Sequence, residues 1–148
     1  MMHQTRGDDG MAAAWGEHVA LCLSQEFGDD LNAVLRALGI RLAVAWQDQP
    51  EFPLPRLAVW QGDTRTIRLF QQPLLRQFPD WNSAARHACA HELFHALAAT
   101  RYRSLPLAVS PPVLSHRAEE IAAAAFARVV APNFRLTLEN GVLNFDQR

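Results

Sequence analysis

The chain has 148 residues, of which 49% are hydrophobic and 20% are charged, and its formal net charge at neutral pH is −1. This balance is typical of one globular domain with an ordinary core, and the charge gives no whole-chain support for binding nucleic acid. All 14 basic residues are arginine, which excludes chemistry that needs a lysine Schiff base.

The cysteines and the N-terminal stretch indicate the compartment. Cys22 and Cys89 lack CxxC spacing, so we expect buried free thiols, which fit a reducing environment. Glu17 and His18 interrupt the apolar stretch 11–23, which therefore predicts neither a signal peptide nor a membrane span. A cytoplasmic protein without membrane partners is expected.

The first part of the chain predicts helices followed by a strand. Residues 1–10 show no periodicity and are expected to be disordered. Apolar side chains at helical spacings predict a helix over 11–27, and a shorter helix over 30–38 that stops at Gly39. Alternating apolar residues then predict a strand over 40–44.

A β-hairpin is expected next. The segments 56–61 and 65–70 flank the turn sequence Gly62-Asp63-Thr64. With this turn, Trp60 and Phe70 cover the far face of the sheet. The expected core face consists of Leu57, Val59, Ile67 and Leu69.

Two alanine-rich segments, 83–99 and 115–130, predict the main helices of the second half. The connection 100–114 between them is long for a small domain, and we expect it to form the rim of a cleft. Alternation on both sides of a central Asn-Gly pair then predicts a terminal β-hairpin over 134–146. The whole chain, 1–148, is expected to form one domain.

The strongest chemical signal lies in the first alanine-rich helix, which carries the HExxH sequence His91-Glu92-Leu93-Phe94-His95. Residues four apart on a helix share a face, so His91 and His95 aim both imidazoles at one point. Glu92 is rotated by about 100°, which lets it act as general base on a metal-bound water rather than as a ligand. A core helix with two hydrogen-bonded histidines is the alternative interpretation.

Catalytic zinc sites generally have three protein ligands, so the motif needs one more side chain. Within the same helix, His87 lies about 12 Å from His95 along the axis, and one straight helix cannot place all three histidines around one ion. The third ligand is therefore expected from the second alanine-rich helix.

Glu120 is the preferred third ligand in that helix. It shares a face with Ala123 and Ala127, whose small side chains would let the helix approach the HExxH helix closely. His116, one turn earlier on the same face, is the first alternative. Glu119 is the second, although its rotation of about 100° predicts a solvated side chain.

Taken together, these motifs resemble the ImmA/IrrE family of metallopeptidases. The resemblance rests on Leu38-Gly39-Ile40 leading into a strand, a strand ending at Phe70, and the HExxH motif. It also rests on an ExxAxxFA motif that begins at Glu120 and is followed by Pro132. Position 94 is usually glycine or alanine in that family, and Phe94 here is expected either to narrow the cleft or to fill a packing gap.

The resemblance implies an α+β fold of the glutamate-type zincin class, in which a small antiparallel or mixed sheet packs on the HExxH helix and on the second alanine-rich helix. It implies Zn²⁺ bound by His91, His95 and Glu120, with Glu92 as base. It further implies an intracellular peptidase that cleaves a specific protein partner, such as a helix-turn-helix repressor, without binding nucleic acid itself.

Two other functions are weighed against this hypothesis. A non-catalytic anti-repressor or toxin–antitoxin module would keep the fold but has no need of Glu92, and a structural zinc site would not leave an open position. In the peptidase hypothesis, an exposed sheet edge could take the substrate as an added strand. The candidates for stabilising an oxyanion are Arg101, Tyr102, Arg103 and His116.

Overall fold

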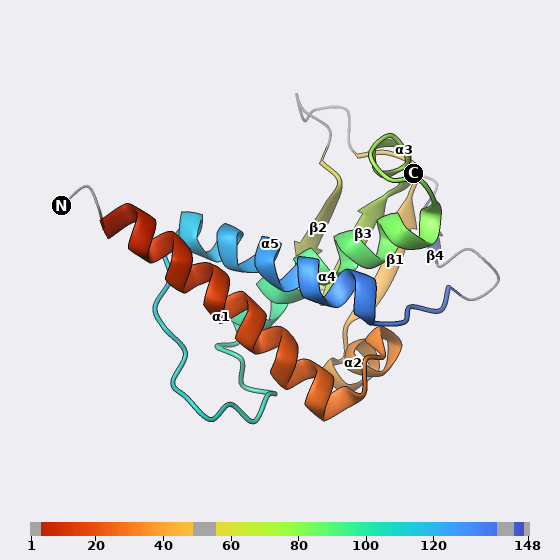
Figure 1. Ribbon diagram of the computed structural model, residues 1–148. Coiled ribbons are helices and arrows are strands. Elements are labelled where there is room, and N and C mark those ends of the chain that lie inside the picture. The colour runs from red at the N-terminus through yellow and green to blue at the C-terminus, as the bar shows by residue number, and fades with distance from the viewer. Residues whose placement is uncertain (1–3, 49–55, 139–143, 147–148) are drawn as a thin grey trace.

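The computed structural model describes residues 4–48, 56–138 and 144–146, and over these residues the chain has an α+β fold with five helices and a small mixed sheet (Figure 1). The helices are α1 (Gln4–Phe27), α2 (Leu31–Leu38), α3 (Gln71–Leu75), α4 (Trp81–Ala99) and α5 (His116–Asn133). The strands are β1 (Arg41–Ala45), β2 (Ala58–Gln61), β3 (Thr66–Phe70) and β4 (Asn144–Asp146). None of the helices in these segments combines the length and apolar character needed to cross a bilayer.

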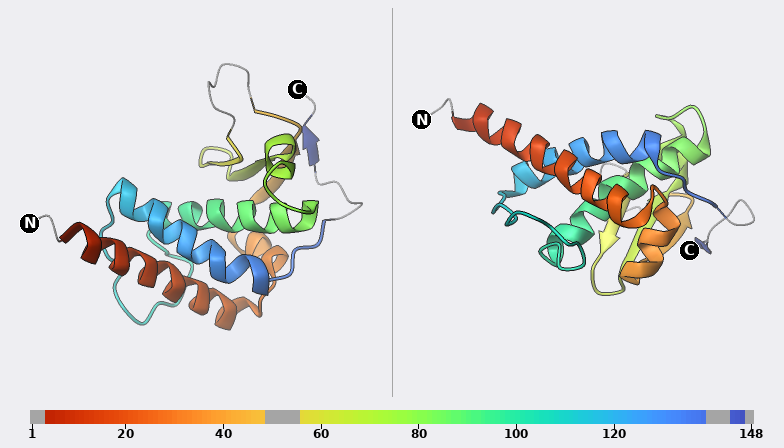
Figure 2. Two further views of the ribbon diagram at one scale, coloured as in Figure 1. Left: turned by 45° about the horizontal axis from the view of Figure 1, so that its top comes forward. Right: turned by 60° about the horizontal axis from the view of Figure 1, so that its bottom comes forward.

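The sheet has the strand order β2-β3-β1-β4. β1 pairs in parallel with both β3 and β4, whereas β2 pairs antiparallel with β3 and forms one edge. Helix α4 lies against β2 and β3 on one side and against α5 on the other, while α1 packs along α5 (Figures 1 and 2). The HExxH helix therefore occupies the middle of the molecule, between the sheet and the other long helices.

Helix α1 begins much earlier than the sequence predicts. The chain is helical from Gln4, so residues 4–10, expected to be disordered, belong to the helix. The extension is supported by a contact that is distant in sequence, an ion pair of 2.7 Å between Asp9 Oδ2 and Arg117 Nη2 of α5. Local periodicity cannot reveal such a contact. Residues 1–3 lie outside the described segments.

Side chains cap the starts of α2, α4 and α5, whereas α3 has no side-chain cap. Asp30 caps α2, which stops at the left-handed Gly39, and Asp80 caps α4. Ser115 accepts a hydrogen bond from the backbone of Ala118 at the start of α5. Pro132 does not end α5 but lies in its last turn, where its missing N–H removes one helical hydrogen bond while Phe134 N still donates to Val130 O at 2.8 Å.

The β2–β3 hairpin has a register that differs by one residue from the expected one. Its turn has four residues rather than three, because Arg65 adopts a left-handed conformation (φ 51°) and belongs to the turn. Trp60 consequently pairs with Ile67 and Ala58 pairs with Leu69. A shift of one residue exchanges the two faces of a strand. Trp60 is therefore partly buried against the core, instead of covering the far face.

The second half of the expected terminal hairpin pairs elsewhere. Residues 144–146 run parallel to β1, and residues 134–138 form no regular strand. Instead, Arg135 forms an isolated parallel bridge with Asp30, and the carbonyl oxygen of Leu136 accepts a hydrogen bond from Asn82 at 3.0 Å. The Asn-Gly turn expected between the two halves lies outside the described residues.

Close helix packing depends on small residues, and Ala123 and Ala127 of α5 are both fully buried. At the crossing of α1 and α5, a Cβ added to Gly16 would lie 2.1 Å from the carbonyl oxygen of Ala122. Phe94 of α4 is fully buried with its ring centroid 5.4 Å from that of Phe126. Phe94 thus fills a packing gap between α4 and α5.

Candidate metal centre

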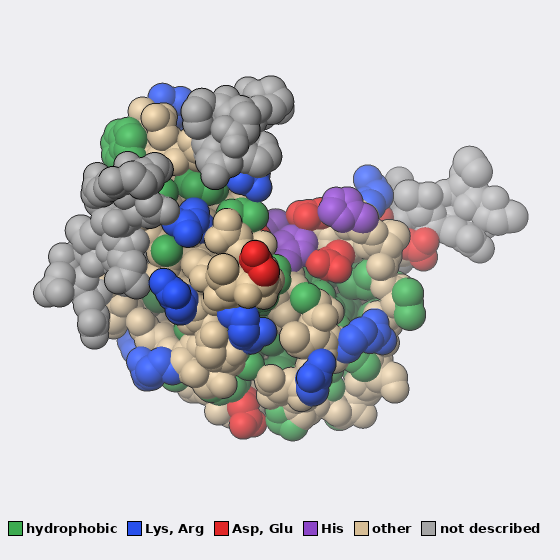
Figure 3. Space-filling model, turned by 180° about the vertical axis from the view of Figure 1, so that it is seen from behind, with side chains coloured by type: hydrophobic (Ala, Val, Ile, Leu, Met, Phe, Trp, Pro, Cys, Tyr) green, Lys and Arg blue, Asp and Glu red, His purple; other side chains and the backbone are tan. Residues whose placement is uncertain are grey.

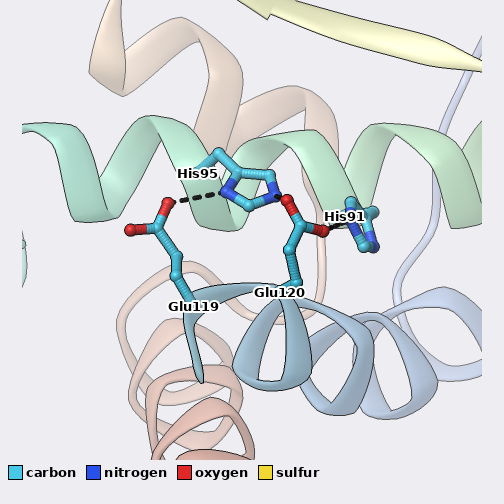
Figure 4. Close-up of polar contacts among 4 residues, drawn as sticks. All are labelled: His91, His95, Glu119 and Glu120. Carbon is cyan, nitrogen blue, oxygen red and sulfur yellow. Dashed lines mark hydrogen bonds and ion pairs between the residues drawn. The ribbon is translucent and has the colours of Figure 1, made fainter. Parts of the chain in front are cut away.

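Helices α4 and α5 bring the three expected ligands together. The side chains of His91 and His95 lie one turn apart on α4, and Glu120 faces them from the first turns of α5 (Figure 4). One potential ligand atom of each residue lies within 4.8 Å of those of the other two. In Figure 3, histidine and carboxylate side chains gather in a hollow of the surface. These three residues could hold a metal ion.

The distances within the cluster match those around a small divalent ion. Glu120 Oε1 lies 3.2 Å from His91 Nε2, and Glu120 Oε2 lies 3.2 Å from His95 Nε2. Ligand atoms at about 2.0–2.1 Å from a tetrahedral ion lie about 3.3 Å from one another. Each of the two oxygen–nitrogen separations is therefore close to the spacing of two ligands of one ion, and one ligand atom from each of the three side chains lies within 4.8 Å of the others.

The sequence predicts a solvated side chain for Glu119, but the structure places this side chain against His95. Its Oε2 lies 2.7 Å from His95 Nδ1, and its side chain is 32% exposed. The expectation considered only the 100° rotation between consecutive helical residues and a single target point. An imidazole has nitrogens on two sides of its ring, so adjacent glutamates can each reach one of them (Figure 4).

The alternative ligand His116 and the oxyanion candidates do not join the cluster. His116 is exposed at the start of α5, and Arg101 and Arg103 are also exposed. Tyr102 is only 4% exposed, and its ring meets that of Trp15 edge-on at 5.3 Å. The connection 100–114 therefore contacts α1 through Tyr102, and this tyrosine belongs to the core.

Glu92 lies between the candidate ligands and the sheet. Burial raises the pKa of its carboxyl group, nearby His95 opposes this effect, and the Glu120 charge adds to it. The backbone of Trp60 in β2 lies close enough to the Glu92 carboxylate to lower its pKa. A carboxylate with a raised pKa is a stronger base, as a proton acceptor near neutral pH must be. The contact from Trp60 depends on the hairpin register, so sequence patterns did not reveal it.

The histidines of α4 also respond to their surroundings. The pKa of His91 is lowered, chiefly by burial and then by His95, which favours the neutral form that binds metals. The pKa of His87 is lowered chiefly by burial, and its ring packs on Phe78 with centroids 5.1 Å apart. His87 is not part of the cluster, as its position on the helix predicts.

No protein-family model matches the chain, and neither the curated proteins nor the solved structures include a match to it.

Proposed function

We propose that the protein is a zinc-dependent peptidase of the glutamate zincin type, similar to the ImmA/IrrE metallopeptidases. In this proposal His91, His95 and Glu120 hold Zn²⁺ and leave a fourth position for water. One observation carries the proposal: two histidines and a carboxylate converge within 4.8 Å, with the carboxylate of Glu92 next to them. A bound zinc ion would lower the pKa of its water and polarise the scissile carbonyl group.

Glu92 acts as the base. Its carboxylate removes a proton from the attacking water and then passes it to the amine of the departing product. The raised pKa of Glu92 suits both steps, because the group must accept and release a proton in one turnover. The backbone of Trp60 approaches the same carboxylate and favours its charged form.

The edge strand β2 offers a place for an extended substrate. Phe70 N donates to Leu57 O at 3.0 Å, and hydrogen-bonded pairs alternate along an antiparallel ladder. Trp60, opposite Ile67, therefore directs its backbone groups away from β3, toward Glu92. A polypeptide added as a strand along this edge would pass beside the candidate metal centre, which suits a protein substrate. The family resemblance suggests a helix-turn-helix repressor and an intracellular location.

The first prediction separates metal binding from catalysis. We expect about one zinc per chain by elemental analysis after supplementation with zinc, and loss of that zinc in His91→Ala. Glu92→Gln should keep the metal but lose the cleavage of a proteome-derived peptide library, measured by mass spectrometry, by at least 100-fold. Glu26→Gln, on the exposed side of α1, is the matched control and should leave both unchanged.

The possible results distinguish the parts of the proposal. A chain that remains free of zinc after supplementation contradicts the metal centre. A zinc-containing chain that cleaves no peptide contradicts the peptidase assignment but keeps the metal. Full cleavage by Glu92→Gln contradicts the role of Glu92 as base.

A further inference from the structure

His95 is held from both sides by consecutive residues of α5. Glu119 Oε2 lies 2.7 Å from His95 Nδ1, while Glu120 Oε2 lies 3.2 Å from His95 Nε2 (Figure 4). The shorter of these two distances is in the range of a charge-assisted hydrogen bond. The longer one matches the separation of two ligands of one ion. The two glutamates therefore have different relations to the same ring.

The contact with Glu119 determines which nitrogen of His95 is free for a metal. A carboxylate accepts a hydrogen bond, so Nδ1 must carry the proton when it faces Glu119. In a neutral imidazole, Nε2 then has the lone pair, and Nε2 is the nitrogen that faces the ligand oxygen of Glu120. A carboxylate on the outer nitrogen also makes the imidazole a stronger ligand.

Glu119 is placed for this role rather than for binding the ion. Its side chain is less exposed than that of Glu120, at 32% against 47%, and its charge contributes to raising the pKa of the buried Tyr102. It approaches the ring nitrogen of His95 opposite to the one that Glu120 approaches (Figure 4). Among the described residues, the cluster that could hold an ion contains Glu120 but not Glu119.

His91 and His95 differ in the number of ring nitrogens that face a carboxylate. In the described segments, His91 is hydrogen-bonded through Nε2 to Glu120, and no carboxylate is found at its other ring nitrogen. The Glu119 carboxylate therefore acts on one ligand only. His95, the less exposed of the pair at 16% against 26%, is the one that it fixes.

We propose that Glu119 is a positioning residue that fixes the tautomer and the ring orientation of His95, so that Nε2 is presented to the metal. This inference rests on the metal centre of the proposed function but not on peptidase activity. Partners of this kind typically change metal affinity by about 10–100-fold when they are removed.

Zinc affinity, measured by competition with a fluorescent chelator, tests the proposal. Glu119→Ala should bind zinc about 10–100-fold more weakly than the unmodified chain. Glu119→Gln should lose less, because an amide oxygen still accepts the hydrogen bond from Nδ1. Glu120→Ala should lose more than either variant, and Glu26→Ala on α1 serves as the surface control. Circular dichroism of each metal-free variant checks that it is folded.

A second readout begins with the unmodified chain. In zinc-loaded, ¹⁵N-labelled protein, His95 should show a protonated Nδ1 that exchanges slowly with solvent and a metal-bound Nε2, and Glu119→Gln should make this exchange faster. Zinc bound through Nδ1 of His95 would overturn the proposal even if Glu119→Ala failed to fold. So would equal zinc affinities of Glu119→Ala and the unmodified chain. A chain that binds no zinc at all would instead remove the metal centre itself.

Discussion

At the scale of single residues, the predicted metal ligands follow from helix geometry, whereas their partners do not. The spacing of His91 and His95 places them on one face of any α-helix, and the position of Glu120 relative to its alanines selects it in the same way. The prediction of a solvated Glu119 is wrong because the rotation of 100° per residue takes no account of the length of the side chain or of the second nitrogen of the His95 ring. The role of Trp60 depends on a strand register that local sequence does not specify.

The chain's single tyrosine allows a direct test of burial at this scale. The pKa of Tyr102 is raised above the ordinary value of a tyrosine, chiefly by burial, and the Glu119 charge adds to the effect. The absorbance of tyrosinate should therefore appear at higher pH in the folded chain than in the chain unfolded by denaturant. Equal titration curves in the two states would contradict a buried Tyr102.

The same shift has a consequence for stability. The unfolded chain releases the Tyr102 proton first as pH rises, so this group lowers the free energy of unfolding only above about pH 10. The loss continues until the pH passes the pKa of the folded state. In Tyr102→Phe, the decrease of stability over this alkaline range should be less steep, as followed by denaturant titrations at several pH values.

At the scale of elements, the crossing of α1 and α5 connects helix packing to the metal centre. A Cβ on Gly16 would lie 2.1 Å from Ala122 O and 3.1 Å from Phe126 N, so Gly16→Ala must push the helices apart. We expect a loss of about 1–3 kcal/mol in the free energy of unfolding. Because Ala122 follows Glu120 by two residues, zinc affinity should fall as well.

The same helix offers a matched control. A Cβ added to Gly10 meets no atom within 4 Å, so Gly10→Ala tests helix propensity alone. This change should stabilise the protein by about 0.5–1 kcal/mol and leave zinc affinity unchanged. Urea titrations of the two variants provide the comparison, and equal effects would contradict the close crossing at Gly16.

Elements were predicted best where capping residues mark them. Asp30, Gly39, Asp80 and Ser115 define helix ends through local hydrogen bonds and backbone angles, which sequence alone can indicate. The predicted register of the β2–β3 hairpin is wrong at Arg65, because a left-handed arginine in a turn has no reliable sequence signature. One extra turn residue was enough to exchange the faces of β2.

At the scale of the whole molecule, metal binding should be coupled to stability. The candidate ligands come from two separate helices, so an ion that binds the folded state alone stabilises the contact between α4 and α5. At zinc concentrations of about 100 times Kd, the gain is about 2.7 kcal/mol. For a chain of this size, that raises Tm by roughly 5–10 °C.

Differential scanning calorimetry with and without Zn²⁺ checks this prediction, and His91→Ala is its control. The variant should melt at the same temperature under both conditions. A rise in Tm that persisted in His91→Ala would place the stabilising ion elsewhere on the protein.

The arrangement of the helices also sets an order of events during synthesis. Helix α5, which carries Glu120, packs between α4 and α1, both of which precede it in the chain. Contacts this distant in sequence form only after the later segment has been translated. A nascent chain therefore exposes His91 and His95 before Glu120 has been translated, and the candidate metal centre is assembled only after α5 has been synthesised.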